Sequence, residues 1–438
     1  MTALAAPGLP PGPRLHPLIQ TAGFMVGGPR FLDACRRRYG GAVYMRTVFD
    51  RGFVMLFDPD LVKQLFQGPH EQLNAGEANA LLGPILGPRS VLLLDGAEHL
   101  RHRRLLLPPF HGERMRAYAD VVRESTDLEV DAWPVGQEFT LLESMQRLTL
   151  RVIVRAVFGY LPGPEAEELS RRLRTMIEPL ARPRGLMVAT LLSRLRGRPP
   201  LESQFESRRR AVDELLYAEI ARRRSDPDLE RRDDVFSALL LGRDEDGSGL
   251  SDREVRDELM TMLLAGHETT ATGLAWAFDL LLHTPTVMER ALGLEEPYLD
   301  AVAKEALRIR PVIPGVGRVV RGEPFALGAY SVPVGIEINP SIRTIHRRGD
   351  LYPEPSRFRP ERFMGPDAPD TYTWLPFGGG TRRCLGASFA LMEMRIVLAR
   401  VLERAGTRLR AADPKLERVQ LRAITQAPRR GVRVVFGG

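Results

Sequence analysis

The sequence predicts one domain that is mainly α-helical and contains small β-sheets. From about residue 59 onward, apolar residues recur at three- and four-residue spacing, which is the period of amphipathic helices. Runs of residues that suit strands are short and few. The 438 residues, 44% of them hydrophobic, can enclose a core large enough for a cofactor and a substrate cavity.

The first expected elements follow a flexible lead-in, residues 1–13, in which Pro7–Pro13 is rich in proline and glycine. Two short strands, Ala42–Thr47 and Gly52–Phe57, are expected around a turn at residues 50–52. Helices are then predicted near residues 59–66, 97–107, 112–133, 142–158, 165–180, 204–225, 233–241, 252–283, 286–293, 296–309 and 385–404. Strands return near residues 317–321, 334–339, 419–424 and 431–436.

Local signals fix some of these boundaries. Ser251 and Glu254 form an S-x-x-E capping box, which starts the longest predicted helix. Two stretches, Asn74–Gly96 and Gly365–Gly380, are rich in glycine and proline and are expected to be functional loops.

The charge pattern argues against a nucleic-acid-binding protein. The formal net charge is +7, but the arginine runs at 36–38, 208–210 and 222–224 lie beside acids, as on solvated helix faces. Two cysteines do not make a disulfide framework, and no apolar run reaches the ~20 residues that span a bilayer. We therefore expect a cytoplasmic protein with no signal peptide and no transmembrane anchor.

One segment has the residues of a reactive cysteine site. Residues 376–386 read PFGGGTRRCLG, and a predicted helix follows directly. The glycines let the backbone pass close to a flat ligand. A helix N-terminus and the charges of Arg382 and Arg383 would stabilise a thiolate at Cys384.

This segment resembles the haem-binding signature F-x-x-G-x-R-x-C-x-G of the cytochrome P450 superfamily. Its fixed positions are filled by Phe377, Gly380, Arg382, Cys384 and Gly386. The resemblance implies a triangular domain with haem b between a long oxygen-side helix and the cysteine-side helix. Cys384 would be the axial iron ligand, whose thiolate favours O–O cleavage. Phe377, Gly378 and Gly386 would contact the cofactor, and Arg382 would pair with a propionate.

A second segment, Ala265-Gly-His-Glu-Thr-Thr270, lies inside the longest predicted helix. Threonine hydroxyls compete for backbone carbonyls, and such a conflict inside a strong helix often marks function. The segment resembles the family's oxygen-binding turn. There Ala265 and Gly266 would border the haem, with Gly266 leaving room over the iron, while Glu268 and Thr269 would guide protons to oxygen.

Three further motifs agree with this resemblance. Glu305-x-x-Arg308, together with Arg362 in a downstream Phe-Arg-Pro-Glu-Arg-Phe run, resembles the family's Glu–Arg–Arg triad, and its role would be structural. His99 and Arg103, at i and i+4 on one helix face, resemble a propionate clamp. Arg318 resembles another propionate ligand, since arginine binds carboxylates at two points.

The resemblance implies a monooxygenase that inserts one atom of O2 into an apolar small molecule, such as a fatty acid, terpenoid, steroid or polyketide. Only about 50 residues follow Cys384, too few for an attached redox domain. NAD(P)H would therefore supply electrons indirectly, through a ferredoxin or flavodoxin and its reductase. An acidic partner would meet Arg383 and the arginines at 101–104.

The substrate would contact apolar walls formed by Leu81, Leu82, Leu264, Val312, Ile313, Val316 and Thr425. Two alternatives stay open: a peroxide-driven haem-thiolate peroxygenase, and a haem-binding sensor without turnover. The Glu268–Thr269 pair favours the monooxygenase, because the family's peroxide-driven members typically lack it.

Overall fold

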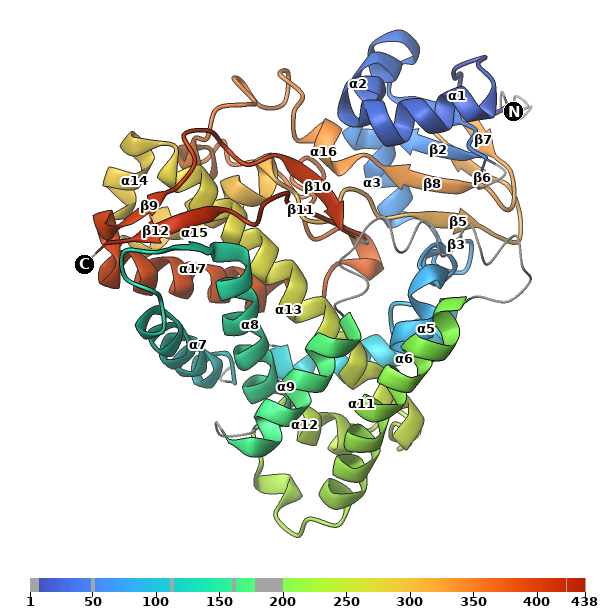
Figure 1. The fold of residues 1–438 in the computed structure, drawn as a ribbon. Coiled ribbons are helices and arrows are strands. Elements are labelled where there is room, and N and C mark those ends of the chain that lie inside the picture. The colour runs from blue at the N-terminus through green and yellow to red at the C-terminus, as the bar shows by residue number, and fades with distance from the viewer. Residues whose placement is uncertain are drawn as a thin grey trace.

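The computed structural model describes residues 8–48, 52–110, 114–159, 163–177, 200–422 and 424–437. Pro7, the turn residues Asp50 and Arg51, and the predicted helical residues 112–113 and 178–180 lie outside this part of the chain. The described part has a triangular outline, in which helices form most of the body and the largest sheet occupies one corner (Figure 1).

The predicted helices are confirmed with small shifts at their ends. The long helix α13 spans Asp252–Leu282, and both hydrogen-bonded halves of its predicted capping box are present. The other predicted helices are α3 (Pro59–Gln67), α6 (Gly96–Leu106), α7 (Arg114–Asp131), α8 (Leu141–Phe158), α9 (Pro164–Ile177), α11 (Pro200–Arg224), α12 (Val235–Leu241), α14 (Pro285–Ala291), α15 (Glu296–Ile309) and α17 (Ala387–Arg404).

Several short elements were not predicted. The N-terminal segment forms α1 (Pro17–Ala22), the π-helical turn η1 (Gly23–Gly27) and α2 (Gly28–Tyr39). The expected loop at 74–96 contains α4 (Ala75–Ala78), η2 (Ala80–Leu82) and α5 (Gly83–Leu86). Apart from α2, which has 12 residues, these helices are too short to show a period, so tertiary contacts decide them. Further single turns are α16 (Ile342–Ile345), η3 (Pro108–Phe110), η5 (Leu229–Arg231), η6 (Pro360–Phe363), η7 (Gly380–Arg382) and η8 (Gly406–Arg408).

The largest sheet has the strand order β1-β2-β8-β5-β3. Its strands are β1 (Ala42–Met45), β2 (Phe53–Leu56), β8 (Glu337–Pro340), β5 (Arg318–Val320) and β3 (Leu73–Asn74). Only the β2–β8 pair in this sheet is parallel. A three-stranded sheet joins β4 (Glu138–Thr140), β12 (Arg433–Phe436) and β9 (Leu409–Ala411), and two hairpins pair β6 (Phe325–Leu327) with β7 (Tyr330–Val332) and β10 (Val419–Arg422) with β11 (Thr425–Pro428).

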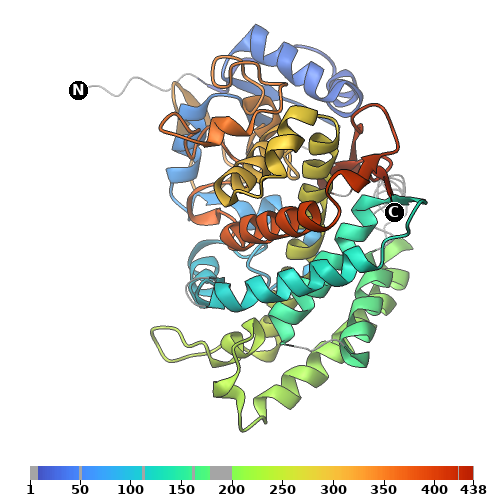
Figure 2. The ribbon, with the colours of Figure 1, turned by 90° about the vertical axis from the view of Figure 1, so that its left-hand side faces the viewer.

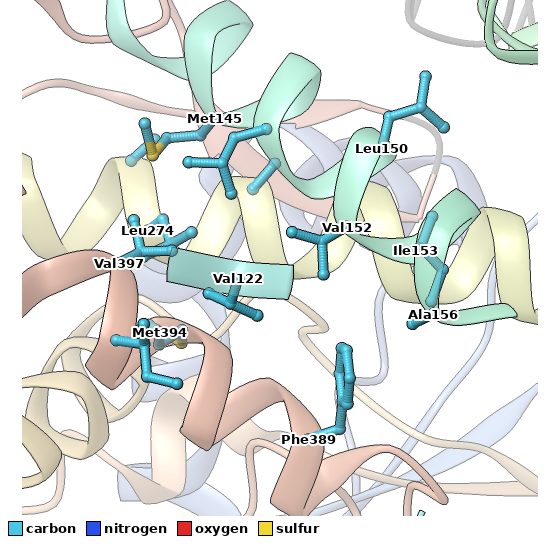
Figure 3. Close-up of a cluster of buried hydrophobic side chains, with 14 of the residues drawn as sticks. Val122, Met145, Leu150, Val152, Ile153, Ala156, Leu274, Phe389, Met394 and Val397 are labelled. Carbon is cyan, nitrogen blue, oxygen red and sulfur yellow. The ribbon is translucent and has the colours of Figure 1, made fainter. Parts of the chain in front are cut away.

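The main core lies where α8 and α17 pack on α13 and α7 packs against α8 and α17. Figure 3 shows side chains from all four helices in this core, among them Val122 of α7, Ile153 of α8, Leu274 of α13 and Met394 of α17. Burial of such apolar surface holds the helices in place. Among the described residues, no helix is both long enough and apolar enough to cross a membrane.

Candidate active site

The central helix α13 has one break in its burial. Between Val255 and Leu281, every residue is buried except Leu264, Ala265, Gly266, Glu268 and Thr269. We call residues 264–269 the window. Along the rest of this stretch α13 is packed on all sides, so the exposed window leaves space for a bound ligand. The window coincides with the predicted oxygen-side turn.

The residues of the window face two directions. Ala265 is the most exposed of them, and Thr269 lies one turn later on the same face, where its hydroxyl donates to the Ala265 carbonyl over 2.5 Å. The predicted role of Gly266, leaving room over the iron, stays a prediction, and the structure adds a packing role for this glycine. A Cβ at Gly266 would approach Ile153 Cδ1 of α8 at 3.0 Å, so this glycine permits close helix packing.

Glu268 points toward α8 rather than toward Thr269. Its Oε2 accepts a hydrogen bond of 2.6 Å from the Gln146 side chain. Burial raises the pKa of Glu268, while the positive charge of Arg422 and the Gln146 hydrogen bond oppose that rise. The carboxyl group therefore holds a proton more readily than a solvated glutamate.

Cys384 lies in the loop before α17, a helix that packs on α13. Its side chain has accessible surface, yet burial raises the pKa of the thiol. These two facts agree if the accessible surface faces an enclosed space. The Gly386 N–H and the charges of Arg103 and Arg383 act in the opposite direction and favour a thiolate.

The glycines of this loop are required by packing. A Cβ at Gly379 would meet the Phe66 ring at 2.2 Å, and one at Gly380 would meet the Phe66 carbonyl at 2.1 Å. Gly378 and Gly380 also have positive φ angles of 65° and 64°. The Cys384 N–H donates to the Phe377 carbonyl over 2.9 Å, which closes the loop. Helix α3, which carries Phe66, therefore fixes the loop from outside.

Four predicted propionate ligands, His99, Arg103, Arg318 and Arg382, form a cluster with Asp95, which we call the open cluster. Burial, and then the charges of Arg382, Arg103 and Arg318, lower the pKa of His99 to about 3. The His99 ring is therefore neutral, and its Nδ1 is buried without a hydrogen-bond partner.

The arginines of the open cluster differ in their partners. Arg382 pairs with Asp95 over 2.5 Å and donates to the Leu94 carbonyl over 2.6 Å. Arg318 donates to the Gly317 carbonyl, and burial, followed by the charge of Arg382, lowers its pKa to about 10. Three arginines and one aspartate leave two positive charges. The cluster thus fits a ligand with two carboxylates, as haem b has.

The predicted triad is assembled in the structure. Arg308 donates to both oxygens of Glu305, over 2.6 and 2.8 Å, and Arg362 donates to the same carboxylate over 3.2 Å. All three side chains are buried. The remaining guanidinium groups donate to the carbonyls of His346 and Glu354, so the charges are well satisfied.

The predicted substrate walls are placed unevenly. Leu81 is exposed, and Leu82, Leu264, Ile313 and Val316 are partly exposed, so these side chains have surface to offer a ligand. Val312 and Thr425 are buried and have little surface to offer a ligand in this conformation, so their place in the substrate wall stays a prediction. The Gln426 N–H donates to the Val312 carbonyl over 2.7 Å, which packs the β10–β11 hairpin against this segment and covers both side chains.

Two site residues escaped the sequence analysis. Gln146 and Asp95 hold Glu268 and Arg382, respectively. Gln146 lies 122 positions before its partner and Asp95 lies 287 positions before its partner, and neither stands in a pattern that would indicate the contact. A sequence reading could have found them only by knowing which helices pack together.

Comparisons with known proteins agree over nearly the whole chain. A family model described as cytochrome P450 matches residues 10–292 and 295–429. A Mycobacterium tuberculosis protein assigned as cytochrome P450 135B1 is 40% identical over 444 aligned residues, covering 99% of this chain and 92% of that protein. Cytochrome P450 137 of the same species is also 40% identical, covering 94% and 86%.

Among solved structures, cyanobacterial CYP120A1 with bound retinoic acid superposes with a TM-score of 0.80, covering 98% of this chain and 99% of that one. At 22% identity, this match supports the fold alone. The family model and the 40% identical relatives carry the assignment further. The chain therefore belongs to the cytochrome P450 family and is a haem-thiolate monooxygenase that uses dioxygen.

Proposed function

We propose that this monooxygenase oxidises an apolar small molecule with electrons supplied by separate redox proteins. The observation that carries the proposal is the window in α13, where Ala265 and Thr269 are accessible within a stretch, residues 255–281, that is buried outside the window. The partly exposed side chains near it are mostly apolar, which suits a fatty acid, terpenoid, steroid or polyketide.

Cys384 and the open cluster are the residues that would hold the haem. When bound, haem supplies dioxygen activation, which a thiolate ligand assists by donating electron density. The positive excess of the open cluster would be neutralised by the two propionates, and the buried Nδ1 of His99 would gain an acceptor. A Cys384→Ser protein is expected to lose the strongly red-shifted carbon monoxide band of the reduced form; keeping that band would rule out this ligand.

Glu268 and Thr269 would deliver protons to the space beside Ala265. Burial raises the pKa of Glu268, which suits a proton donor, and the Thr269 hydroxyl can pass a proton on. Because the two side chains have different partners, the transfer requires a water molecule or a rotation of Glu268 away from Gln146. Gln146 would therefore position the acid rather than take part in the chemistry.

The surface that binds the redox partner would lie on the outer side of the cysteine loop. A hollow of about 220 Å³ beside this loop is lined by Lys304, Trp374, Phe377 and Arg383, among others. Arg101 pairs with Asp244 and Glu254, and Arg104 pairs with Glu245, so their contribution to this surface stays a prediction. We propose that a ferredoxin or flavodoxin, reduced by an NAD(P)H-dependent reductase, docks at this hollow.

One positively charged side chain near the window, Arg422, favours apolar substrates that carry a carboxylate. Arg422 ends β10 at the hairpin turn, and its charge reaches Glu268 in the window. Retinoic acid, the ligand named for the CYP120A1 structure, is an apolar molecule that ends in a carboxylate. A test panel should therefore pair apolar carboxylic acids with their esters, and tighter binding of the acids by wild type than by Arg422→Gln would support this contact.

The decisive experiment compares two sources of oxidising power. Turnover of a substrate found by the shift in the haem spectrum is measured with ferredoxin, reductase and NAD(P)H, and separately with hydrogen peroxide. The proposal expects turnover with the redox proteins, and it expects Thr269→Ala to consume NAD(P)H with little product. Efficient turnover with peroxide alone would indicate a peroxygenase, and no turnover with any ligand that binds would indicate a sensor.

A further inference from the structure

The first described segment, residues 8–48, contains a helix whose polar side chains are buried and whose apolar side chains are exposed. In α1, the polar residues Gln20 and Thr21 are 1% and 8% exposed, whereas the apolar residues Leu18 and Ile19 are 60% and 55% exposed. A helix on an ordinary soluble surface shows the reverse arrangement. The inversion therefore points to something that covers the apolar face.

The orientation of α1 is fixed by hydrogen bonds. The Gln20 amide donates to the carbonyls of Pro13 and Leu15, over 3.1 and 2.8 Å, and accepts from the Arg46 N–H over 3.0 Å. The Thr21 hydroxyl donates to the Pro17 carbonyl and accepts from the Val48 N–H over 3.1 Å. The bonds from Arg46 and Val48 tie the polar face to the chain after β1, and those to Pro13 and Leu15 tie it to the chain before α1, which leaves the apolar face exposed.

Exposed apolar side chains gather in this segment. Of the thirteen large apolar side chains that are exposed among the described residues, five lie here: Leu15, Leu18, Ile19, Phe24 and Val48. Since residues 8–48 are about a tenth of the described chain, this is a concentration rather than the usual scatter of single residues.

The same segment carries most of the net charge. Residues 8–48 contain six arginines, a single acid (Asp33), and no lysine or glutamate, which gives +5 of the total +7. Arg14 and Arg46 line a hollow together with Gly12, Pro13 and Tyr44, directly beside α1. An apolar ridge flanked by arginines is the composition of helices that lie in the interface of an anionic membrane.

We propose that this N-terminal surface docks peripherally on an anionic lipid bilayer. Leu18 and Ile19 would enter the boundary of the acyl chains, and Arg14 and Arg46 would pair with headgroup phosphates. A second copy of the chain is a poorer occupant, because a symmetric contact would bring two segments of +5 together. Figure 1 shows α1 and α2 at the outer edge of the molecule, beside the five-stranded sheet, where a flat bilayer can approach.

The turned view supports this geometry. In Figure 2, the segment again lies at the rim of the molecule. Because no described helix can span a membrane, the expected mode is a helix lying on the surface. This inference is independent of the substrate and of the redox partners.

The test is sedimentation of the full-length haem-loaded protein with large vesicles. One vesicle population contains phosphatidylcholine alone, and the other contains phosphatidylcholine and phosphatidylglycerol at about two to one. The wild-type protein is expected to sediment with the anionic vesicles, and salt should weaken the binding. The double variant Leu18→Gln/Ile19→Gln should bind on the order of 30-fold more weakly, because both apolar contacts are lost.

A charge variant, Arg14→Gln/Arg46→Gln, should lose roughly 30-fold and become less sensitive to salt. Two control variants replace exposed aliphatic residues and exposed arginines elsewhere on the surface: Leu128→Gln/Leu416→Gln and Arg116→Gln/Arg253→Gln. Both controls should bind as wild type does. An unchanged haem spectrum and an unchanged thermal unfolding curve identify variants that keep the fold.

Three results would overturn the proposal. Wild-type protein that stays in the supernatant would leave an acidic protein partner as the occupant of this surface. Equal loss of binding in the control and test variants would place the contact elsewhere. Self-association that disappears in Leu18→Gln/Ile19→Gln, without vesicle binding by the wild type, would identify the surface as a contact between copies of the chain.

Discussion

Two groups of charges flank the cysteine loop: the triad is fully buried and the open cluster is partly buried, and they differ in how their charges are balanced. In the triad, Glu305 accepts from Arg308 and Arg362, and the guanidinium groups also reach backbone carbonyls. In the open cluster, two positive charges are left over and His99 Nδ1 has no partner. A buried charge is costly unless it is paired, so the first group is complete by itself and the second requires a ligand.

The largest expected effect comes from breaking the triad. Glu305→Gln keeps the shape of the side chain but leaves two buried arginines without an anion, which should lower the free energy of unfolding by about 3–5 kcal/mol. Denaturant unfolding measures this loss. The control is Glu361→Gln, which removes a half-exposed pair with Arg290 and should cost no more than about 1 kcal/mol. Similar losses in the two variants would contradict a structural role for the triad.

The next effect comes from removing the single acid of the open cluster. Asp95 accepts from Arg382 and from the backbone N–H groups of Gly76 and Glu77. Asp95→Asn raises the excess charge to about +3 and should destabilise the haem-free protein by about 2 kcal/mol. The loss should shrink when haem is bound, because the propionates supply negative charge. Equal losses with and without haem would show that the cluster is not a carboxylate site; Asp120→Asn, in an exposed pair with Arg123, is the control.

His99 gives the open cluster a dependence on pH. Its pKa is about 3 in the folded protein and close to 6.5 when unfolded, so the unfolded chain takes up the proton first as pH falls. Stability is therefore lost between about pH 6.5 and 3, and the share of His99 between about pH 7.5 and 5.5 is about 1 kcal/mol. Burial also lowers the pKa of His267 to about 4 and of His346 to about 3, which adds slopes of the same sign.

A His99→Gln variant should flatten that part of the stability profile without abolishing it. The effect is measured as the difference in unfolding free energy between the two pH values, in wild type and variant, without haem. An unchanged slope would show that His99 is already accessible to protons in the folded state.

The sequence predicted much of this site because its signals are local. Cys384 and its glycines, the Glu305–Arg308 spacing and the threonines of α13 are all recognisable within a few residues. What it missed depends on which elements touch. Gly266 faces Ile153, Thr425 is covered by the segment of Val312, and Gln146 holds Glu268. The inverted helix α1 was missed for a related reason: its six residues are too few to reveal which face points inward.

The smallest expected effect on stability has the opposite sign, and it separates the two groups most clearly. Arg318 and Arg308 are both buried arginines, but Arg318 has only a backbone carbonyl as its recorded hydrogen-bond acceptor, whereas Arg308 holds a carboxylate with two bonds. Arg318→Gln should leave the haem-free protein unchanged or more stable by about 0.5 kcal/mol, because a desolvated and repelled charge is removed. The same variant should lose haem to a competing apoprotein about ten-fold faster, since a charge-assisted bond to a propionate is gone.

The contrasting variant is Arg308→Gln, which should strongly destabilise the haem-free chain. If both variants destabilise the haem-free chain alike, Arg318 is a structural residue and the open cluster does not require a ligand to balance its charges.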